Sequence, residues 1–508
     1  MGFQCKNCGG DVLFDAALQK MKCQYCGSIF APEEYQVHNQ SRKTTVDGLT
    51  LYTCGSCGAE LQGTEESQVG FCPYCGGQSM LQTSSDSRNE TEYIVPFQVT
   101  REKCAELFQA HTKHVRYLPK ALKDAAHLQS FTGIYMPYYE YDVELGQSQI
   151  KGKKTVESNS RYEIINTYQI DAEVSGDYCG VPYDASRYLD DEIAARVLPF
   201  DKNRERPFEA SYLSGFYADA STVSPETYSQ DAAAQASRDI LAEVSDRVNA
   251  DEGIRVDTEA SSIDTRTRGF HRSLMPLWFL TWRSEDRVAY AVVNGDSGKV
   301  VTDLPVDMRS FTIGCAVIAA VLFAVLELFF QPTPVLTSAL SILAAVLMAF
   351  SVRSSTKRIY EKQTHANDKG WTGDAAPKKK SKLGILTLLA IVLGVVGVLA
   401  ALGSNDNMPA KLVGAVGVFL TLLVTRKVLN WQSEIPEKQP MLAILLVLGA
   451  VLINAAVVFI SPVSDLWYYL GDAVCILILV LASVVMMRVY NIGTMRPLPK
   501  LFDRKEVR

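Results

Sequence analysis

Four C-x-x-C pairs near the N-terminus constrain this chain more than any other feature of its sequence. They form two sets, and in each set fourteen residues separate one pair from the next. Such turns place two thiolates on one side of a metal ion, and two turns complete a tetrahedral shell. The sequence therefore predicts two metal sites, one held by Cys5, Cys8, Cys23 and Cys26 and the other by Cys54, Cys57, Cys72 and Cys75.

Structural Zn²⁺ is the metal that we expect at both sites. Each pair is followed directly by a glycine, which suits a chain that turns left-handed after the second ligand. A redox-active pair would begin a helix in a thioredoxin-like unit, and iron–sulfur clusters use other spacings. Four cysteine ligands leave no open coordination position, so we expect no hydrolytic chemistry there.

The charge of the N-terminal region argues against nucleic-acid binding. Residues 1–90 carry six basic and ten acidic side chains, whereas a surface that follows phosphates needs clustered Lys and Arg. Two small β zinc ribbons, at residues 1–40 and 48–82, are therefore expected to serve as docking modules or folding staples. A polar linker at residues 83–91 follows them.

Residues 92–308 are expected to form an α+β cytosolic domain with a mainly antiparallel sheet. Thr100 is a candidate helix cap, and residues 132–145, 161–175, 276–282 and 288–293 have the composition of strands. Residues 186–197 and 225–248 are typical of helices. We found no nucleophile elbow, phosphate-binding loop or dinucleotide fingerprint, so we expect that the protein is not an enzyme and has no catalytic residues.

The last 200 residues have a different composition. Residues 1–308 carry 30 basic and 45 acidic side chains, but residues 309–508 carry 20 and 11. An all-α transmembrane bundle of about six helices is expected within residues 309–490, followed by a basic cytosolic tail at 491–508. The expected spans are residues 311–330, 334–352, 383–402, 408–425, 441–460 and 466–487.

The distribution of basic residues predicts how the chain is oriented. Residues 353–382 and the tail after the last span are rich in Lys and Arg, whereas the short linkers on the other side have none. The positive-inside rule then predicts a multi-pass plasma-membrane protein whose N-terminal domains and C-terminus are cytoplasmic. Glu327 and Asp472 lie near the predicted outer face, where headgroup contact is sufficient to explain them.

Five further segments, taken with the cysteine sets, resemble a family of bacterial zinc-ribbon membrane proteins often labelled "transcription-factor-type zinc ribbon". They are residues 132–142, 181–186, 211–216, 274–278 and 294–301. The resemblance implies a membrane-stress module whose partners are a phage-shock protein A relative, a TPM-domain membrane protein and an SPFH or virion-core-like protein. It also implies that the eight cysteines are the zinc ligands.

We therefore expect a zinc-binding membrane adaptor or scaffold that acts in membrane stress or envelope homeostasis by docking proteins at the inner face of the membrane. The lipid bilayer is expected to be a further partner. One alternative is a nucleic-acid-binding zinc-ribbon protein tethered to the membrane. The other is a transporter-like membrane protein. The sequence leaves both alternatives open.

Overall fold

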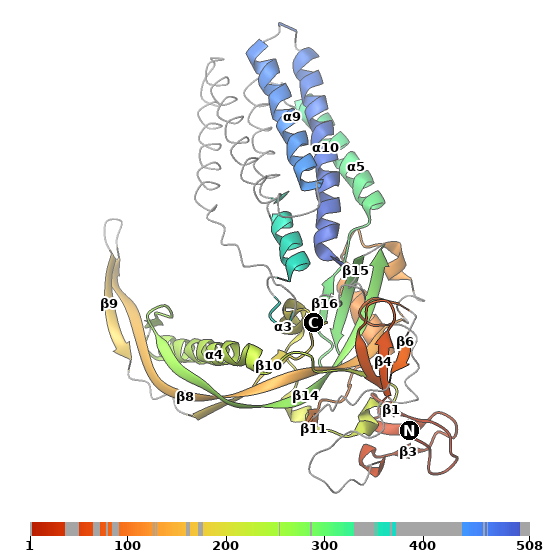
Figure 1. The fold of residues 1–508 in the computed structure, drawn as a ribbon. Helices are drawn as coiled ribbons and strands as arrows, with labels where there is room; N and C mark the ends of the chain where they lie inside the picture. Colours follow the sequence, from red (N-terminus) through yellow and green to blue (C-terminus); the bar gives the residue numbers. More distant parts are fainter. Residues whose placement is uncertain are drawn as a thin grey trace, which may run out of the picture.

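Two long strands form the centre of the computed structural model of this chain (Figure 1). They are β8 (Thr132–Ser158) and β14 (Ser262–Ser284). They pair antiparallel: Thr132 lies opposite Phe279 at one end of the ladder, and Gln149 lies opposite Ser262 at the other. The structure describes residues 3–35, 50–63, 72–77, 80–83, 91–124, 128, 130–158, 163–170, 176–252, 254–284, 287–329, 351–352, 354–365, 368–371, 439–460, 463–464 and 466–497.

Shorter strands extend both edges of this ladder. β8 pairs with β9 (Glu163–Ile170), β10 (Gly176–Asp184) and β13 (Arg255–Val256). β14 pairs with β15 (Arg287–Asn294), which in turn pairs with β16 (Val300–Asp303). Two pairings are parallel, namely β12 (Tyr217–Asp219) with β8 and β7 (Tyr93–Ile94) with β14, while β11 (Arg206–Pro207) pairs antiparallel with β7.

The sheet is therefore mixed, because two of its pairings are parallel, which the sequence did not predict, while its other pairings are antiparallel. The physical reason is that β7 and β12 reach the sheet from segments distant in sequence. A hydrophobic pattern indicates that a strand is buried, but not in which direction it runs beside its neighbour.

The two cysteine sets lie on different sheets. β1 (Val12–Asp15), β2 (Lys20–Cys23) and β3 (Ile29–Phe30) form a separate three-stranded sheet, followed by the 3₁₀ turn η1 (Pro32–Tyr35). β4 (Thr50–Cys54), β5 (Glu60–Gly63) and β6 (Met80–Thr83) belong instead to the large sheet, because β5 pairs with β12. The second cysteine set is thus built into the main sheet.

Helices pack against the sheet where the sequence predicts them. α1 (Arg101–Thr112) begins after Thr100, whose side chain accepts a hydrogen bond from the Lys103 amide at 3.3 Å. α3 (Asp191–Val197) and α4 (Glu226–Glu252) are also present, and α4 lies along the concave face of β8 and β14 (Figure 1). The remaining short turns are η2 (Lys120–Lys123), η3 (Lys202–Arg204) and η4 (Ala210–Leu213).

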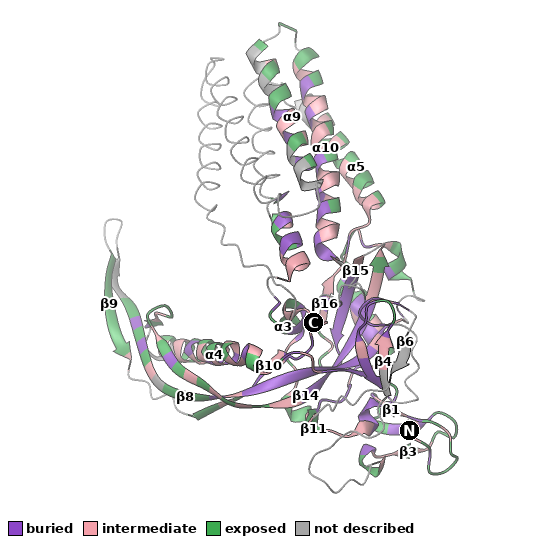
Figure 2. Ribbon diagram, viewed as in Figure 1, coloured by how far each residue is buried: buried purple, intermediate pink, exposed green. Residues whose placement is uncertain are grey.

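Burial is concentrated where β8, β14 and β15 lie side by side. Figure 2 shows this central part of the strands as buried, whereas the arm formed by β9 and the far end of β8 is largely exposed. The core there is strongly aromatic. Trp278 lies with its ring centroid 5.0 Å from that of Phe97 and 5.9 Å from that of Phe216, and its indole N–H donates to the carbonyl oxygen of Val99 at 2.8 Å.

The expected bundle of six transmembrane helices is wrong. Among the described residues, two helices are long and apolar enough to cross a membrane, in α5 (Met308–Phe329) and α10 (Leu466–Thr494). α9 (Gln439–Ile460) packs against α10. The expected spans at 383–402 and 408–425, and that at 334–352 apart from Ser351 and Val352, lie outside the described residues. Apolar composition alone does not determine whether a run forms one spanning helix.

The two candidate spans are joined to the soluble part at one end. The Asn491 side chain of α10 accepts a hydrogen bond from the Val306 amide and donates one to the Val306 carbonyl oxygen, both at 2.8 Å. Arg287 of β15 donates to the carbonyl oxygens of Ile492 and Met495. The chain after α10 then returns to the sheet as β17 (Arg496–Pro497), which pairs with β15. The start of α5 and the end of α10 are therefore fixed to the same part of the sheet.

A partly buried acidic group lies near this junction. Asp191 accepts hydrogen bonds from the Tyr228 hydroxyl at 2.7 Å and the Lys369 amide at 2.9 Å. Burial, reinforced by the nearby Asp368 carboxylate, raises the pKa of Asp191 to about 6. Because this folded-state pKa lies above the unfolded value, the group's stabilising contribution is complete below about pH 4 and is lost as the pH rises through about 6.

The Asp191→Asn variant is expected to remove this pH dependence. Between pH 4 and pH 7 the free energy of unfolding of the variant should rise by about 2.5 kcal/mol relative to that of the wild type, because a shift of one pKa unit corresponds to about 1.4 kcal/mol. Denaturant titrations of detergent-solubilised protein at several pH values measure the difference. Asp177→Asn, at an exposed position, is the control. Parallel pH profiles for wild type and Asp191→Asn would contradict the assignment.

Candidate metal centres

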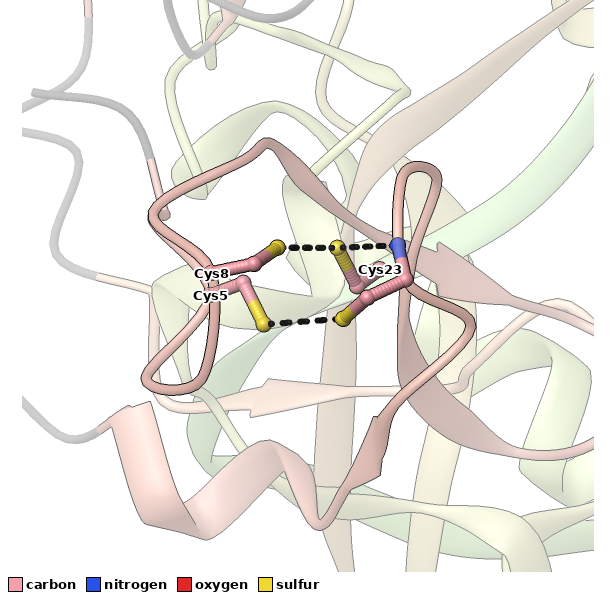
Figure 3. A group of neighbouring side chains, drawn as sticks. Cys5, Cys8 and Cys23 are labelled. Atoms are coloured by element: carbon pink, nitrogen blue, oxygen red, sulfur yellow. Dashed lines mark hydrogen bonds between the residues drawn. The ribbon is translucent and has the colours of Figure 1, made fainter.

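The four cysteines of each predicted set come together. In both clusters all four sulfur atoms lie within 4.8 Å of one another, so each cluster can hold a metal ion. Figure 3 shows the first cluster, where Cys5 and Cys8 face the second pair across the site. The Sγ–Sγ distances are 3.6 Å between Cys5 and Cys26 and 3.5 Å between Cys8 and Cys23.

The second cluster has the same geometry. Its Sγ–Sγ distances are 3.5 Å between Cys54 and Cys75 and 3.7 Å between Cys57 and Cys72. Four sulfurs at Zn–S bond lengths of about 2.3 Å around a tetrahedral ion would lie about 3.8 Å apart. All eight cysteines are free thiols. The donor type and spacing in both clusters therefore fit a tetrathiolate metal site.

The same backbone turn builds all four cysteine pairs. In each pair the carbonyl oxygen of the first cysteine accepts a hydrogen bond from the amide of the glycine four residues later, at 2.8–3.2 Å. These glycines have φ between 65° and 74°, a conformation that other residues rarely adopt. The left-handed turn expected after each pair is thus confirmed at Gly9, Gly27, Gly58 and Gly76.

Backbone amides also point at the sulfurs. The amides of Asn7, Tyr25 and Gly77 each donate to a cysteine Sγ at 3.4 Å. Hydrogen bonds from Ser28 lower the pKa of Cys26 to about 6. Both effects favour the thiolate, which is the form that binds metal.

The clusters differ most in their exposure. Cys8 and Cys26 of the first cluster are exposed, whereas all four cysteines of the second are buried. Tyr74, between Cys72 and Cys75, is itself buried and donates a hydrogen bond to Asp219 at 2.5 Å. Burial raises the pKa of Asp219 to about 6.

Contacts from β14 and β15 hold the second cluster in place. The Thr281 and Tyr290 hydroxyls donate to the carbonyl oxygens of Pro73 and Tyr74. The second site is therefore part of the protein core, whereas the first has two buried and two exposed ligands.

A third group of metal-binding residue types was not predicted from the sequence. Glu140, Glu205 and His271 bring one potential ligand atom each to within 4.8 Å of one another. Glu140 and His271 are 131 positions apart and become neighbours only through the pairing of β8 with β14. No local spacing connects them, so no motif in the sequence could have identified the group.

Fold and site together define a protein with two tetrathiolate clusters and two apolar helices of membrane-spanning length. The chain is 24% identical over 333 residues to the uncharacterized protein YdjG of Bacillus subtilis (strain 168), a match that covers 65% of this chain and 97% of YdjG. No family model and no solved structure matches. About a third of this chain therefore lies outside the similarity to YdjG.

Proposed function

We propose that this protein is a membrane-anchored adaptor that binds two structural Zn²⁺ ions and docks protein partners at the inner face of the membrane. Its four-sulfur clusters supply no open metal position, which supports structural rather than catalytic metal. Zinc thiolates also persist in a reducing compartment, in agreement with a cytosolic location.

The junction of the helices with the sheet supports the anchoring role. The segment just before α5 is bonded to the end of α10, and the end of α10 is bonded to β15, so both helices would enter the membrane from the same side. Basic residues flank this end, including Arg309, Arg488 and Arg496. Basic residues beside a span favour the cytoplasmic side.

The observation that carries the docking role is the exposure of three apolar side chains on the first cysteine sheet and its turns. Tyr25, Ile29 and Leu18 are 90%, 50% and 44% exposed. We call these three residues the ribbon surface. It belongs to the three-stranded sheet and its turns, at the opposite end of the molecule from α5, α9 and α10 (Figure 1). An aromatic side chain so exposed is typical of an interaction site, because Tyr is enriched in binding hot spots.

The family resemblance suggests which partners to test. A phage-shock protein A relative, a TPM-domain protein and an SPFH or virion-core-like protein are the candidates. Each would be co-expressed with the tagged full-length chain and recovered from mild detergent. Replacing both Tyr25 and Ile29 with Ser is expected to reduce recovery of the bound partner by roughly tenfold or more, as for loss of a hot spot.

Ile164→Ser is the matched control, because Ile164 is 44% exposed on β9 and lies outside the ribbon surface. Its partner recovery should equal that of the wild type. Failure of the wild-type chain to recover any of the three partners, or equal recovery by the ribbon-surface variant, would refute the proposal.

A further inference from the structure

Glu140, Glu205 and His271 meet on one face of the central sheet. Glu140 of β8 and His271 of β14 are direct cross-strand partners, and His271 Nε2 lies 2.6 Å from Glu140 Oε2. Glu205 follows η3, and its Oε1 lies 3.8 Å from His271 Nε2. Three elements distant in the sequence thus direct one nitrogen and two oxygen donors toward a common point.

The group has more negative than positive charge. Glu140 is only 3% exposed, yet in the described part of the chain His271 is the one cationic side chain within ion-pair distance of either carboxylate. A protonated imidazole can neutralise one carboxylate but not both. Because a partly buried carboxylate without a counter-charge is costly, the arrangement favours a second positive charge at this place, either a proton or a bound cation.

Neighbouring side chains orient the donors. The Ser273 hydroxyl donates to Glu205 Oε1 at 2.6 Å and lies 3.5 Å from Glu140 Oε2. The Tyr93 ring packs edge-on against the imidazole, with ring centroids 5.2 Å apart. Such surrounding contacts fix the direction of metal ligands and support their affinity. The His271 side chain remains 23% exposed, which leaves a route from solvent.

We propose that Glu140, Glu205 and His271 form a third metal site, which binds a divalent first-row transition-metal cation of the Mn²⁺ class. Two carboxylates and one imidazole are harder ligands than the thiolates of the cysteine clusters, and they suit a cation that prefers oxygen and nitrogen. Ligands at about 2.1 Å from an octahedral ion lie about 3 Å apart, so the ion would replace the 2.6 Å hydrogen bond after a shift of a few tenths of an ångström. Water would occupy the remaining coordination positions.

Mn²⁺ is the probe that separates this site from the cysteine clusters, because it binds thiolates weakly. Full-length, zinc-loaded protein in detergent would be titrated with Mn²⁺, while the electron paramagnetic resonance signal of the free ion is followed. We expect saturable binding of one Mn²⁺ per chain. The bound ion should also show hyperfine coupling to an imidazole nitrogen, which tests His271 in the wild-type protein without any substitution.

Glu205→Gln and His271→Ala are expected to weaken Mn²⁺ binding by roughly tenfold or more. Glu144→Gln is the control, because it makes a comparable change at an exposed position on β8, and its affinity should be unchanged. Circular dichroism would verify that each variant folds. Absence of saturable Mn²⁺ binding, absence of nitrogen coupling, or unchanged binding by folded His271→Ala would each overturn the proposal.

Discussion

Replacing Cys72 with serine is expected to release one metal ion and to unfold the soluble part of the protein. The second cluster is buried, and its strands are continuous with the main sheet through β5 and β12. Loss of a structural zinc removes binding energy that is also folding energy, about 10 kcal/mol in small zinc domains. Because a domain is stable by only about 5–15 kcal/mol, that loss is large enough to unfold it.

Metal content per chain and the thermal unfolding of detergent-solubilised protein measure both effects. Cys8→Ser is the matched variant, because Cys8 is an exposed ligand of the first cluster. It should also release one metal ion, yet the main unfolding transition should remain close to that of the wild type. If Cys72→Ser and Cys8→Ser destabilise the protein equally, the second cluster does not have the structural role assigned to it.

The second large effect is expected from Trp278→Ala, which should lower the free energy of unfolding by about 3–5 kcal/mol. Trp278 is buried against Phe97 and Phe216, and its N–H is satisfied by Val99. Truncation would leave a large cavity and an unpaired carbonyl oxygen. Trp278→Phe keeps part of the ring contact and should cost less than Trp278→Ala.

Urea titration followed by far-ultraviolet circular dichroism would rank the two variants. Trp467→Ala provides the control, because Trp467 is 57% exposed at the start of α10, at the other end of that helix from the soluble part. It should leave the unfolding of the soluble part unchanged. A loss below about 1 kcal/mol for Trp278→Ala would indicate that the aromatic cluster is not part of the stable core.

The cysteine turns were predictable because their geometry is local. Each needs two cysteines three positions apart and a glycine that adopts positive φ, and all of these are visible in the sequence. The Thr100 cap of α1 and the hairpin of β14 and β15 are local in the same sense. Patterns of this kind depend on contacts between residues close in sequence.

Other features depend on contacts between distant segments. Nothing near Cys72 indicates that β5 pairs with β12, about 150 positions later. The meeting of Glu140 with His271 likewise requires the register of β8 against β14. The prediction of six transmembrane helices was wrong for a related reason. The apolar composition of a segment does not show how that segment packs in the fold.

The return of the chain from α10 to the sheet makes a short mechanical linkage. Arg496, the first residue of β17, lies over the Tyr290 ring at 5.8 Å, and the Tyr290 hydroxyl is bonded to the turn between Cys72 and Cys75. A displacement of α10 would therefore be transmitted to the second cysteine cluster through the side chains of Arg496 and Tyr290.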